Sequence, residues 1–291
     1  MNWTDIRQIA GQIWSHLKSQ VTSWFGGGRS DMSWGYGDSN GSATWHHNYP
    51  HAAGSHQSPV NIQTGDAECD QHLLPLKPQY FHSECTTLVN TGNGVQVRAD
   101  SQAPNYRMGD TEYRLAQFHF HWGATSNEGS EHTVNGRPYS AELHLVHYNS
   151  TKYKTAAEAL DKPDGLAVIG VFIKVGKRHH HFQKLCDLLN KIRYKNQMVD
   201  LCEGFDLMGL LPHDLHHYWT YAGSLTTPPC YQSVRWLVLM EPIEFSEDQL
   251  EAFRQMELVT EEQADRGDHA RCLHNFRPTQ PLNDRKISSS F

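Results

Sequence analysis

The sequence predicts a mostly β domain with a few helices. Strand-like runs, separated by clusters of Gly, Asn and Pro, fill residues 57–150. A near-continuous apolar run at 165–175 predicts a strand that is buried on both faces. No linker interrupts the 291-residue chain after its N-terminal segment. We therefore expect one domain over residues 31–291, which is large enough to bury a core without disulfides.

The first 30 residues read as a separate extension. Apolar residues recur at three- and four-residue steps up to residue 24, which predicts an amphipathic helix, and Gly26–Gly28 ends it. No uninterrupted apolar stretch follows a basic start, so this is not a secretory signal. Three interpretations stay open: a mitochondrial targeting segment, a helix lying on a membrane or on the protein's own surface, and a disordered tail. We favour the first, which predicts a mitochondrial location, with a cytoplasmic location as the alternative.

Composition narrows the possible partners. A formal net charge of −7 and a pI near 6.3, without a basic patch, argue against binding to nucleic acid. No run approaches 18 consecutive apolar residues, so no transmembrane segment is expected. The six cysteines include no C-x-x-C pair, and we expect free thiols in a domain of this size.

Two strand-like segments carry histidines in a metal-binding pattern. The stretch Asn90–Gly94 reads as a turn, and residues 117–122 and 142–147 then alternate apolar with polar side chains, which predicts two β-strands. Side chains two apart on a strand share a face, so the histidines of each strand can point to one side. Three imidazoles with a fourth position open are typical of a catalytic zinc site rather than a structural one. We therefore predict that the metal ligands are His119, His121 and His144.

A polar residue accompanies the histidines on each strand. Gln117 lies on the histidine face of the first strand, and Glu142 lies on that of the second. Either side chain can accept a ring N–H, which fixes the tautomer and direction of a ligating histidine. The first alternative is a set of ordinary core histidines, since a lone strand histidine is more often that. The second is a histidine-rich metal buffer, which predicts scattered histidines without such partners.

Two later segments have the spacing of helices. They are residues 182–190 and 247–256, and Ser246 can cap the second. The triplet His179–His181 precedes the first helix. A solvated loop is the preferred interpretation of this triplet over a metal site, because no other ligand lies nearby in sequence.

Several motifs resemble, in order, those of the α-class carbonic anhydrases. The motifs at the histidines are Gln-Phe-His-Phe-His-Trp-Gly at 117–123, Gly-Ser-Glu-His-Thr-Val at 129–134 and Ala-Glu-Leu-His-Leu-Val-His at 141–147. Further agreement comes from Trp-Gly-Tyr-Gly at 34–37, Gln-Ser-Pro-Val-Asn-Ile at 57–62, the stretch 218–229 and Asn-Phe-Arg-Pro at 275–278. The resemblance covers residues 32–291. It implies a single domain with a large twisted, mainly antiparallel sheet and peripheral short helices.

The resemblance also implies an activity. The expected enzyme is a carbonate dehydratase, a zinc hydro-lyase that converts CO2 reversibly to bicarbonate and a proton by attack of zinc-bound hydroxide. Thr226 would orient the hydroxide and donate to Glu131, while Tyr36 and Thr227 would organise the water of the site. The residues that match the apolar wall of the substrate pocket are Val146, Val168, Leu225 and Trp236.

One position departs from the family pattern. The fastest members carry a proton-transferring histidine where this chain has Asn93, and an amide cannot take up a proton. Slow proton export is therefore expected, through water chains, buffer or a more distant group such as His46 or His47. We expect a monomer that acts on a small molecule. A catalytically silent relative acting as a binding domain is the competing hypothesis, which the complete histidine set disfavours.

Overall fold

The computed structural model describes residues 34–291, of which Gly35–Phe291 form one unit. The predicted N-terminal helix and the boundary near residue 30 lie outside the described residues. Within the described part of the chain, no helix is long and apolar enough to cross a bilayer.

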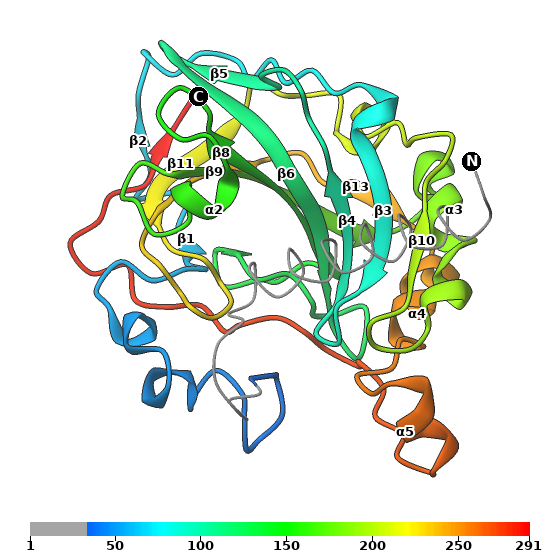
Figure 1. Cartoon of the computed structure of the whole chain (residues 1–291). Coiled ribbons are helices and arrows are strands. Elements are labelled where there is room, and N and C mark those ends of the chain that lie inside the picture. The colour runs from blue at the N-terminus through cyan, green and yellow to red at the C-terminus, as the bar shows by residue number, and fades with distance from the viewer. Residues whose placement is uncertain (1–33) are drawn as a thin grey trace. The chain divides into compact units, whose positions relative to one another are not determined.

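A large twisted sheet organises this unit (Figure 1). Its ten main strands follow the spatial order β10–β3–β4–β6–β8–β9–β12–β11–β14–β2. In that order, their bounds are Met198–Asp200, Cys85–Asn90, Val95–Ala99, Thr111–Trp122, Ala141–Asn149, Leu166–Val175, Val234–Leu239, Tyr218–Gly223, Ser288–Ser289 and Glu68–Cys69. Two short strands extend the sheet, β5 (Tyr106–Met108) on β6 and β13 (Ile243–Phe245) on β9. A separate parallel pair joins β1 (Asn61–Ile62) to β7 (Thr133–Val134).

The pairing directions confirm the expected mainly antiparallel sheet. From β10 across to β9, every neighbouring pair on the main path is antiparallel. The sheet is nevertheless mixed, because β12 and β13 both run parallel to β9, and β14 runs parallel to β2. The expected turn at Asn90–Gly94 joins β3 to β4, and the apolar run at 165–175 forms β9, of which all but the last two residues are buried.

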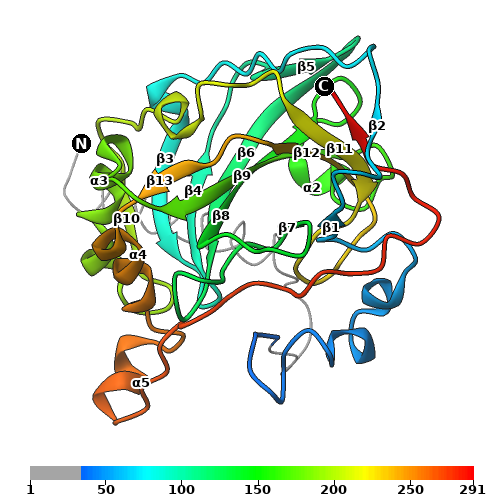
Figure 2. The ribbon, with the colours of Figure 1, turned by 180° about the vertical axis from the view of Figure 1, so that it is seen from behind.

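The helices are short and lie around the sheet (Figures 1 and 2). The α-helices of the described residues are α2 (Ala156–Ala159), α3 (His180–Cys186), α4 (Glu247–Arg254) and α5 (Glu261–Asp265). The 3-10 turns are η1 (Trp45–His47), η2 (Pro50–Ala53), η3 (His82–Glu84), η4 (Leu189–Ile192) and η5 (Met208–Leu210). Ser246 is the N-cap residue of α4, and its backbone amide donates to the Gln249 side chain at 3.2 Å.

The expected loop at His179–His181 is wrong. The ring of His179 accepts a hydrogen bond from the Phe182 amide at 3.2 Å, which caps the helix and lets α3 begin at His180. The predicted helix over 182–190 is also divided, since α3 ends at Cys186 and η4 follows it. The triplet therefore belongs to a helix start rather than to a solvated loop.

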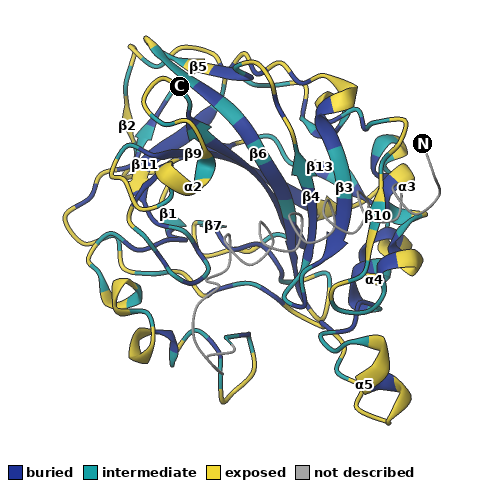
Figure 3. Cartoon of the chain, viewed as in Figure 1, coloured by how far each residue is buried: buried dark blue, intermediate teal, exposed yellow. Residues whose placement is uncertain are grey.

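The central strands of the sheet are buried along much of their length (Figure 3). Their alternating side chains divide the core into two clusters, one on each side of these strands. The aromatic side chains of β6 pack toward α3 and α4. Phe120 contacts Phe182 with ring centroids 5.5 Å apart, and Trp122 stacks on Phe253 at 4.8 Å. The opposite side chains of β6 therefore face away from this cluster, and they include His119 and His121.

Candidate metal centre

The three predicted ligands meet because β6 and β8 are direct antiparallel neighbours. His119 lies opposite His144 in the register of the two strands, and His121 lies opposite Glu142. The ring centroids are 4.9 Å apart for His119 and His121, 5.2 Å for His119 and His144, and 4.6 Å for His121 and His144. One nitrogen from each ring lies within 4.8 Å of the other two, so the three residues can hold one metal ion.

In each of the three rings, the nitrogen that faces away from the other two rings contacts an oxygen acceptor, and the three contacts have similar lengths. They join His119 Nδ1 to Gln117 Oε1 at 2.8 Å, His121 Nδ1 to the Asn275 carbonyl at 2.8 Å, and His144 Nε2 to Glu142 Oε1 at 2.7 Å. Because each of these oxygens can only accept, the facing ring nitrogen carries the proton, and the tautomers are fixed. The lone pairs then lie on Nε2 of His119, Nε2 of His121 and Nδ1 of His144.

The site favours neutral imidazoles, the form that binds metals. Burial lowers the pKa of His119, His121 and His144, and it lowers that of His121 to about 3. The His121 Nε2 atom is buried and has no hydrogen-bond partner. A buried, unpaired nitrogen of this kind is costly unless a further ligand completes it, and a metal ion does so.

The Glu142 carboxylate connects the ligands to the rest of the site. Its Oε2 accepts from the backbone amides of Glu131 at 2.9 Å and His132 at 2.8 Å. Its Oε1 accepts from His132 Nδ1 at 2.7 Å and from His144. Burial alone would raise the pKa of Glu142, but His132 and His144 lower it overall. The carboxylate therefore carries a negative charge on the side of His144 away from the free nitrogen.

A second buried carboxylate, Glu131, lies on the other side of the same histidines. Its Oε1 accepts from the Arg277 amide at 2.9 Å, and its Oε2 lies 3.4 Å from His121 Nε2. Burial raises the pKa of Glu131, and the neighbouring Thr226 side chain opposes this rise. The geometry thus brings Thr226 and Glu131 together next to the free ring nitrogens.

The predicted pocket residues lie beside the histidines. Val146 pairs with Val168 across β8 and β9, and Val168 pairs with Trp236 across β9 and β12. These three belong to one buried cluster, against which Leu225 packs. The Trp236 ring meets the His144 ring edge to face at 4.7 Å. An apolar wall therefore stands next to the predicted ligand His144.

The remaining predicted residues lie in loops. Tyr36 has a pKa raised by burial and, next, by the charge of Glu131, which places its phenol within electrostatic reach of the site. Thr227 is half-buried after Thr226 and its carbonyl accepts from the Cys230 amide. Asn93 lies in the turn between β3 and β4, and its carbonyl accepts from Asn275 Nδ2 at 3.2 Å.

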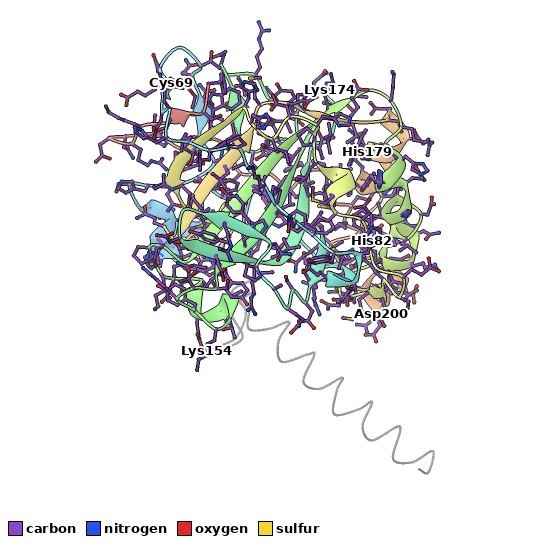
Figure 4. The ribbon with its side chains drawn as sticks, turned by 90° about the horizontal axis from the view of Figure 1, so that it is seen from above. Cys69, His82, Lys154, Lys174, His179 and Asp200 are labelled. Atoms are coloured by element: carbon purple, nitrogen blue, oxygen red, sulfur yellow. The ribbon has the colours of Figure 1, made fainter. Side chains whose placement is uncertain are left out.

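The strand pattern alone does not single out a hydrogen-bonded chain behind the ligands. From Glu142 it runs through His132 to Tyr221, whose hydroxyl lies 2.7 Å from His132 Nε2 and 2.9 Å from Ser58 Oγ. Ser58 Oγ accepts from the Ser224 amide at 3.0 Å. Each of these residues falls in a motif quoted above. The resemblance of the motifs could therefore have identified this chain, whereas the alternation of residues along the strands could not. By contrast, His179 lies at the periphery of the domain beside α3 (Figure 4) and is not part of the centre.

Three imidazoles with fixed tautomers, two of them buried and one half-buried in a large twisted sheet beside an apolar wall, are typical of the class of mononuclear metal-dependent lyases and hydrolases. Comparison with known proteins agrees with this class and narrows it. The model of the family described as eukaryotic-type carbonic anhydrase matches residues 40–291. The proteins called carbonic anhydrase 7 from Mus musculus and Homo sapiens are each 45% identical over 264 residues, which is 89% of this chain and 97% of theirs.

The chain therefore belongs to the eukaryotic-type, or α-class, carbonic anhydrase family. It is a carbonate dehydratase, an enzyme that hydrates CO2. The resemblance seen in the sequence motifs and the fold that it implied are both confirmed. The comparisons give no support to the mitochondrial preference, and the segment on which that preference rested lies outside the described residues.

Proposed function

We propose that this protein converts CO2 reversibly to bicarbonate and a proton at a zinc ion held by His119 Nε2, His121 Nε2 and His144 Nδ1. The observation that carries the proposal is the convergence of three ring nitrogens whose partners leave their lone pairs available. The buried His121 Nε2 without a partner fits a metal ligand. Bound zinc supplies a nucleophile at neutral pH, because it lowers the pKa of its water to about 7, the value known for carbonic anhydrases.

Thr226 and Glu131 orient the attacking oxygen in this proposal. The Thr226 hydroxyl donates a hydrogen bond to the carboxylate, so its lone pairs are left to accept a hydrogen bond from the nucleophile. The nucleophile then presents its own lone pair to the carbon of CO2. The Arg277 amide, which donates to the other Glu131 oxygen, holds the carboxylate in place. Tyr36 and Thr227 order the water around it.

The apolar wall binds the substrate. CO2 is small and has no net dipole, so it gains from a dry surface and needs no hydrogen-bond donor. Val146, Val168, Leu225 and Trp236 supply this surface beside His144. Gln117 and Glu142 keep the ligating rings in direction, as their contacts with His119 and His144 support.

Proton export is the slow part of the cycle in this proposal. Each hydration releases one proton, and the residue at the position of the family's proton-transferring histidine is Asn93, which has no titratable group. The Asn93 backbone is held by Asn275. Export therefore depends on water chains, on buffer and on titratable groups farther from the metal centre.

Stopped-flow CO2 hydration tests the proposal. The purified protein is measured as isolated, after removal of zinc by a chelator, and after zinc is added back. We expect activity to disappear with the metal and to return with about one zinc per chain. A catalytically silent binding domain would show no hydration in any of the three samples, and a metal buffer would bind several ions without hydrating CO2.

Three further features belong to the proposal. The enzyme acts as a monomer, which sedimentation at micromolar concentration checks. Residues 1–30 are an extension to a catalytic domain that spans 31–291. They direct the protein to mitochondria, so a tagged variant without them should move to the cytosol with its activity intact. Equal distribution of the truncated and full-length proteins would refute targeting.

A further inference from the structure

Asn93 is one of three asparagines in the chain that a glycine follows, and the others are Asn40 and Asn135. An asparagine before glycine readily loses its side-chain amide, because glycine has no Cβ and leaves the following backbone nitrogen uncovered. That nitrogen attacks the side-chain carbon Cγ when the two atoms can approach each other. The hydrogen bonds that restrain these two groups in the fold therefore decide which of the three pairs reacts.

Neither reacting group of the Asn93–Gly94 pair is held. Among the described residues, no hydrogen bond involves the carboxamide of Asn93 or the backbone amide of Gly94. Both residues are half-buried, so water reaches them. The bonds of this turn hold other atoms, since the Asn93 amide donates to Thr91 Oγ1 at 3.2 Å and the Asn93 carbonyl accepts from Asn275 Nδ2. The backbone of Asn93 is therefore fixed, while its side chain can turn toward the Gly94 nitrogen.

The pair Asn135–Gly136 is held at both groups. Oδ1 of Asn135 accepts from the Thr64 amide at 2.9 Å, and Nδ2 donates to Thr64 Oγ1 at 3.0 Å. The Gly136 amide, which would have to attack, donates to Asn61 Oδ1 at 2.8 Å. Attack on the Asn135 side chain therefore requires these bonds to open first, and each bond that opens adds to the barrier.

The pair Asn40–Gly41 is restrained in another way. Oδ1 of Asn40 accepts from the Gly37 amide at 3.2 Å, and Gly41 is buried. The Gly41 backbone lies so close to the Gly37 carbonyl that a Cβ atom on Gly41 would lie 2.5 Å from that oxygen. Little room is left for the Asn40 side chain to turn. Of the three pairs, Asn93–Gly94 is thus the least restrained.

We propose that Asn93–Gly94 is a self-modification site, at which the side-chain amide is lost and an acid takes its place. The Gly94 nitrogen forms a bond to Asn93 Cγ, the bond from Cγ to Nδ2 breaks, and ammonia leaves with the proton of the Gly94 amide. A succinimide ring results. Water then opens the ring at either of its carbonyls and gives aspartate or isoaspartate. In sum, water is consumed and ammonia is released, without an oxidant or a metal, so the reaction is independent of the proposed function.

The product carries a charge next to a residue that contacts the metal centre. Asn275, whose side chain donates to the Asn93 carbonyl at 3.2 Å, also accepts from His121 Nδ1 through its own carbonyl at 2.8 Å. In isoaspartate, the main chain runs through Cγ, and the former carbonyl of residue 93 becomes part of a free carboxylate. Either acid is charged at neutral pH, because carboxyl groups ordinarily have pKa values of about 4. The reaction therefore adds a negative charge to the turn that Asn275 holds.

Ageing the purified full-length protein in mildly alkaline buffer tests the proposal. Peptide mapping by mass spectrometry measures the acid formed at each asparagine, with Asn40 and Asn135 as controls in the same molecule. We expect Asn93 to react about tenfold faster than Asn135, because at least two hydrogen bonds must open at Asn135. In protein unfolded by guanidinium, the three pairs should react at similar rates. Folding that slows Asn93 as much as Asn135, or a faster reaction at Asn40 than at Asn93, would overturn the proposal.

The variant Asn93→Gln links the new charge to this position. Glutamine keeps an amide, but its attack would need a larger ring, which forms far more slowly. Isoelectric focusing of the aged wild type should show an additional acidic form, which an isoaspartyl methyltransferase with its methyl donor should label. Both signals should largely disappear in Asn93→Gln and persist in the control Asn48→Gln, which replaces an exposed asparagine that no glycine follows. Signals of undiminished strength in Asn93→Gln would refute the proposal.

Discussion

Replacing Glu142 with Gln should weaken zinc binding about 100-fold. The carboxylate accepts four hydrogen bonds, two on each oxygen, and an amide must turn its NH2 group toward one of these pairs. If NH2 faces the backbone amides of Glu131 and His132, two buried N–H groups lose their acceptor. Each costs about 1–3 kcal/mol, and a backbone amide has no other protonation state to adopt.

The other orientation is therefore the one we expect, with NH2 facing the rings of His132 and His144. These rings can accept on that side only by carrying their proton on the other nitrogen. For His144, that nitrogen is Nδ1, which is the proposed metal ligand. Zinc binding then requires an unfavourable tautomer of His144. Loss of a residue that hydrogen-bonds to a metal ligand typically weakens metal affinity roughly 10- to 100-fold, a range for which carbonic anhydrases are themselves an example. We expect the upper end of this range, which corresponds to about 2.7 kcal/mol.

Competition for zinc with a chelator of known affinity measures this loss. The matched control is Glu244→Gln, which removes a glutamate charge on β13, and it should bind zinc as the wild type does. Thermal unfolding of the zinc-free proteins checks that both variants fold. A zinc affinity of Glu142→Gln within threefold of the wild type would refute the argument from tautomers.

Three more predictions follow from other contacts. Thr226→Ala should keep zinc but lose about 100-fold in kcat/KM, as expected for one positioned polar partner of about 2.7 kcal/mol, and an unchanged kcat/KM would rule out its role. Asn93→His should raise kcat in weak buffer without changing zinc content; a wild-type kcat that is already insensitive to imidazole would contradict slow export. His147 is buried, which lowers its pKa from 6.5 to about 4. The unfolded chain then binds the extra proton between these pH values, so stability is full above pH 6.5 and falls toward pH 4 by roughly 3 kcal/mol. Urea unfolding of His147→Gln should show a flatter pH dependence than the wild type, and equal slopes would exclude this contribution.

Strand periodicity was enough to predict the ligand strands and their polar partners. The two-residue period of β6 predicts that His119 and His121 lie on the face opposite Phe118 and Phe120. The structure confirms this arrangement. It could not show that β6 and β8 are neighbours, because pairing is set by contacts far apart in sequence. The motif resemblance supplied that step.

The missing parts of the site come from backbone and from distant segments. The partner of His121 is a main-chain carbonyl at residue 275, and every residue type offers such a group, so no side-chain pattern marks it. The helix at 180 began early for a similar reason. The His179 ring caps this helix by a local hydrogen bond, which the spacing of apolar residues does not reveal.

Zinc content per chain tests the central claim most directly. Metal analysis compares the purified wild type with the variants His119→Ala, His121→Ala and His144→Ala, with His72→Ala as a control outside the centre. The account predicts about one zinc in the wild type and the control, and far less than one in each ligand variant, because two imidazoles cannot complete the site. Stoichiometric zinc in all three ligand variants would contradict it.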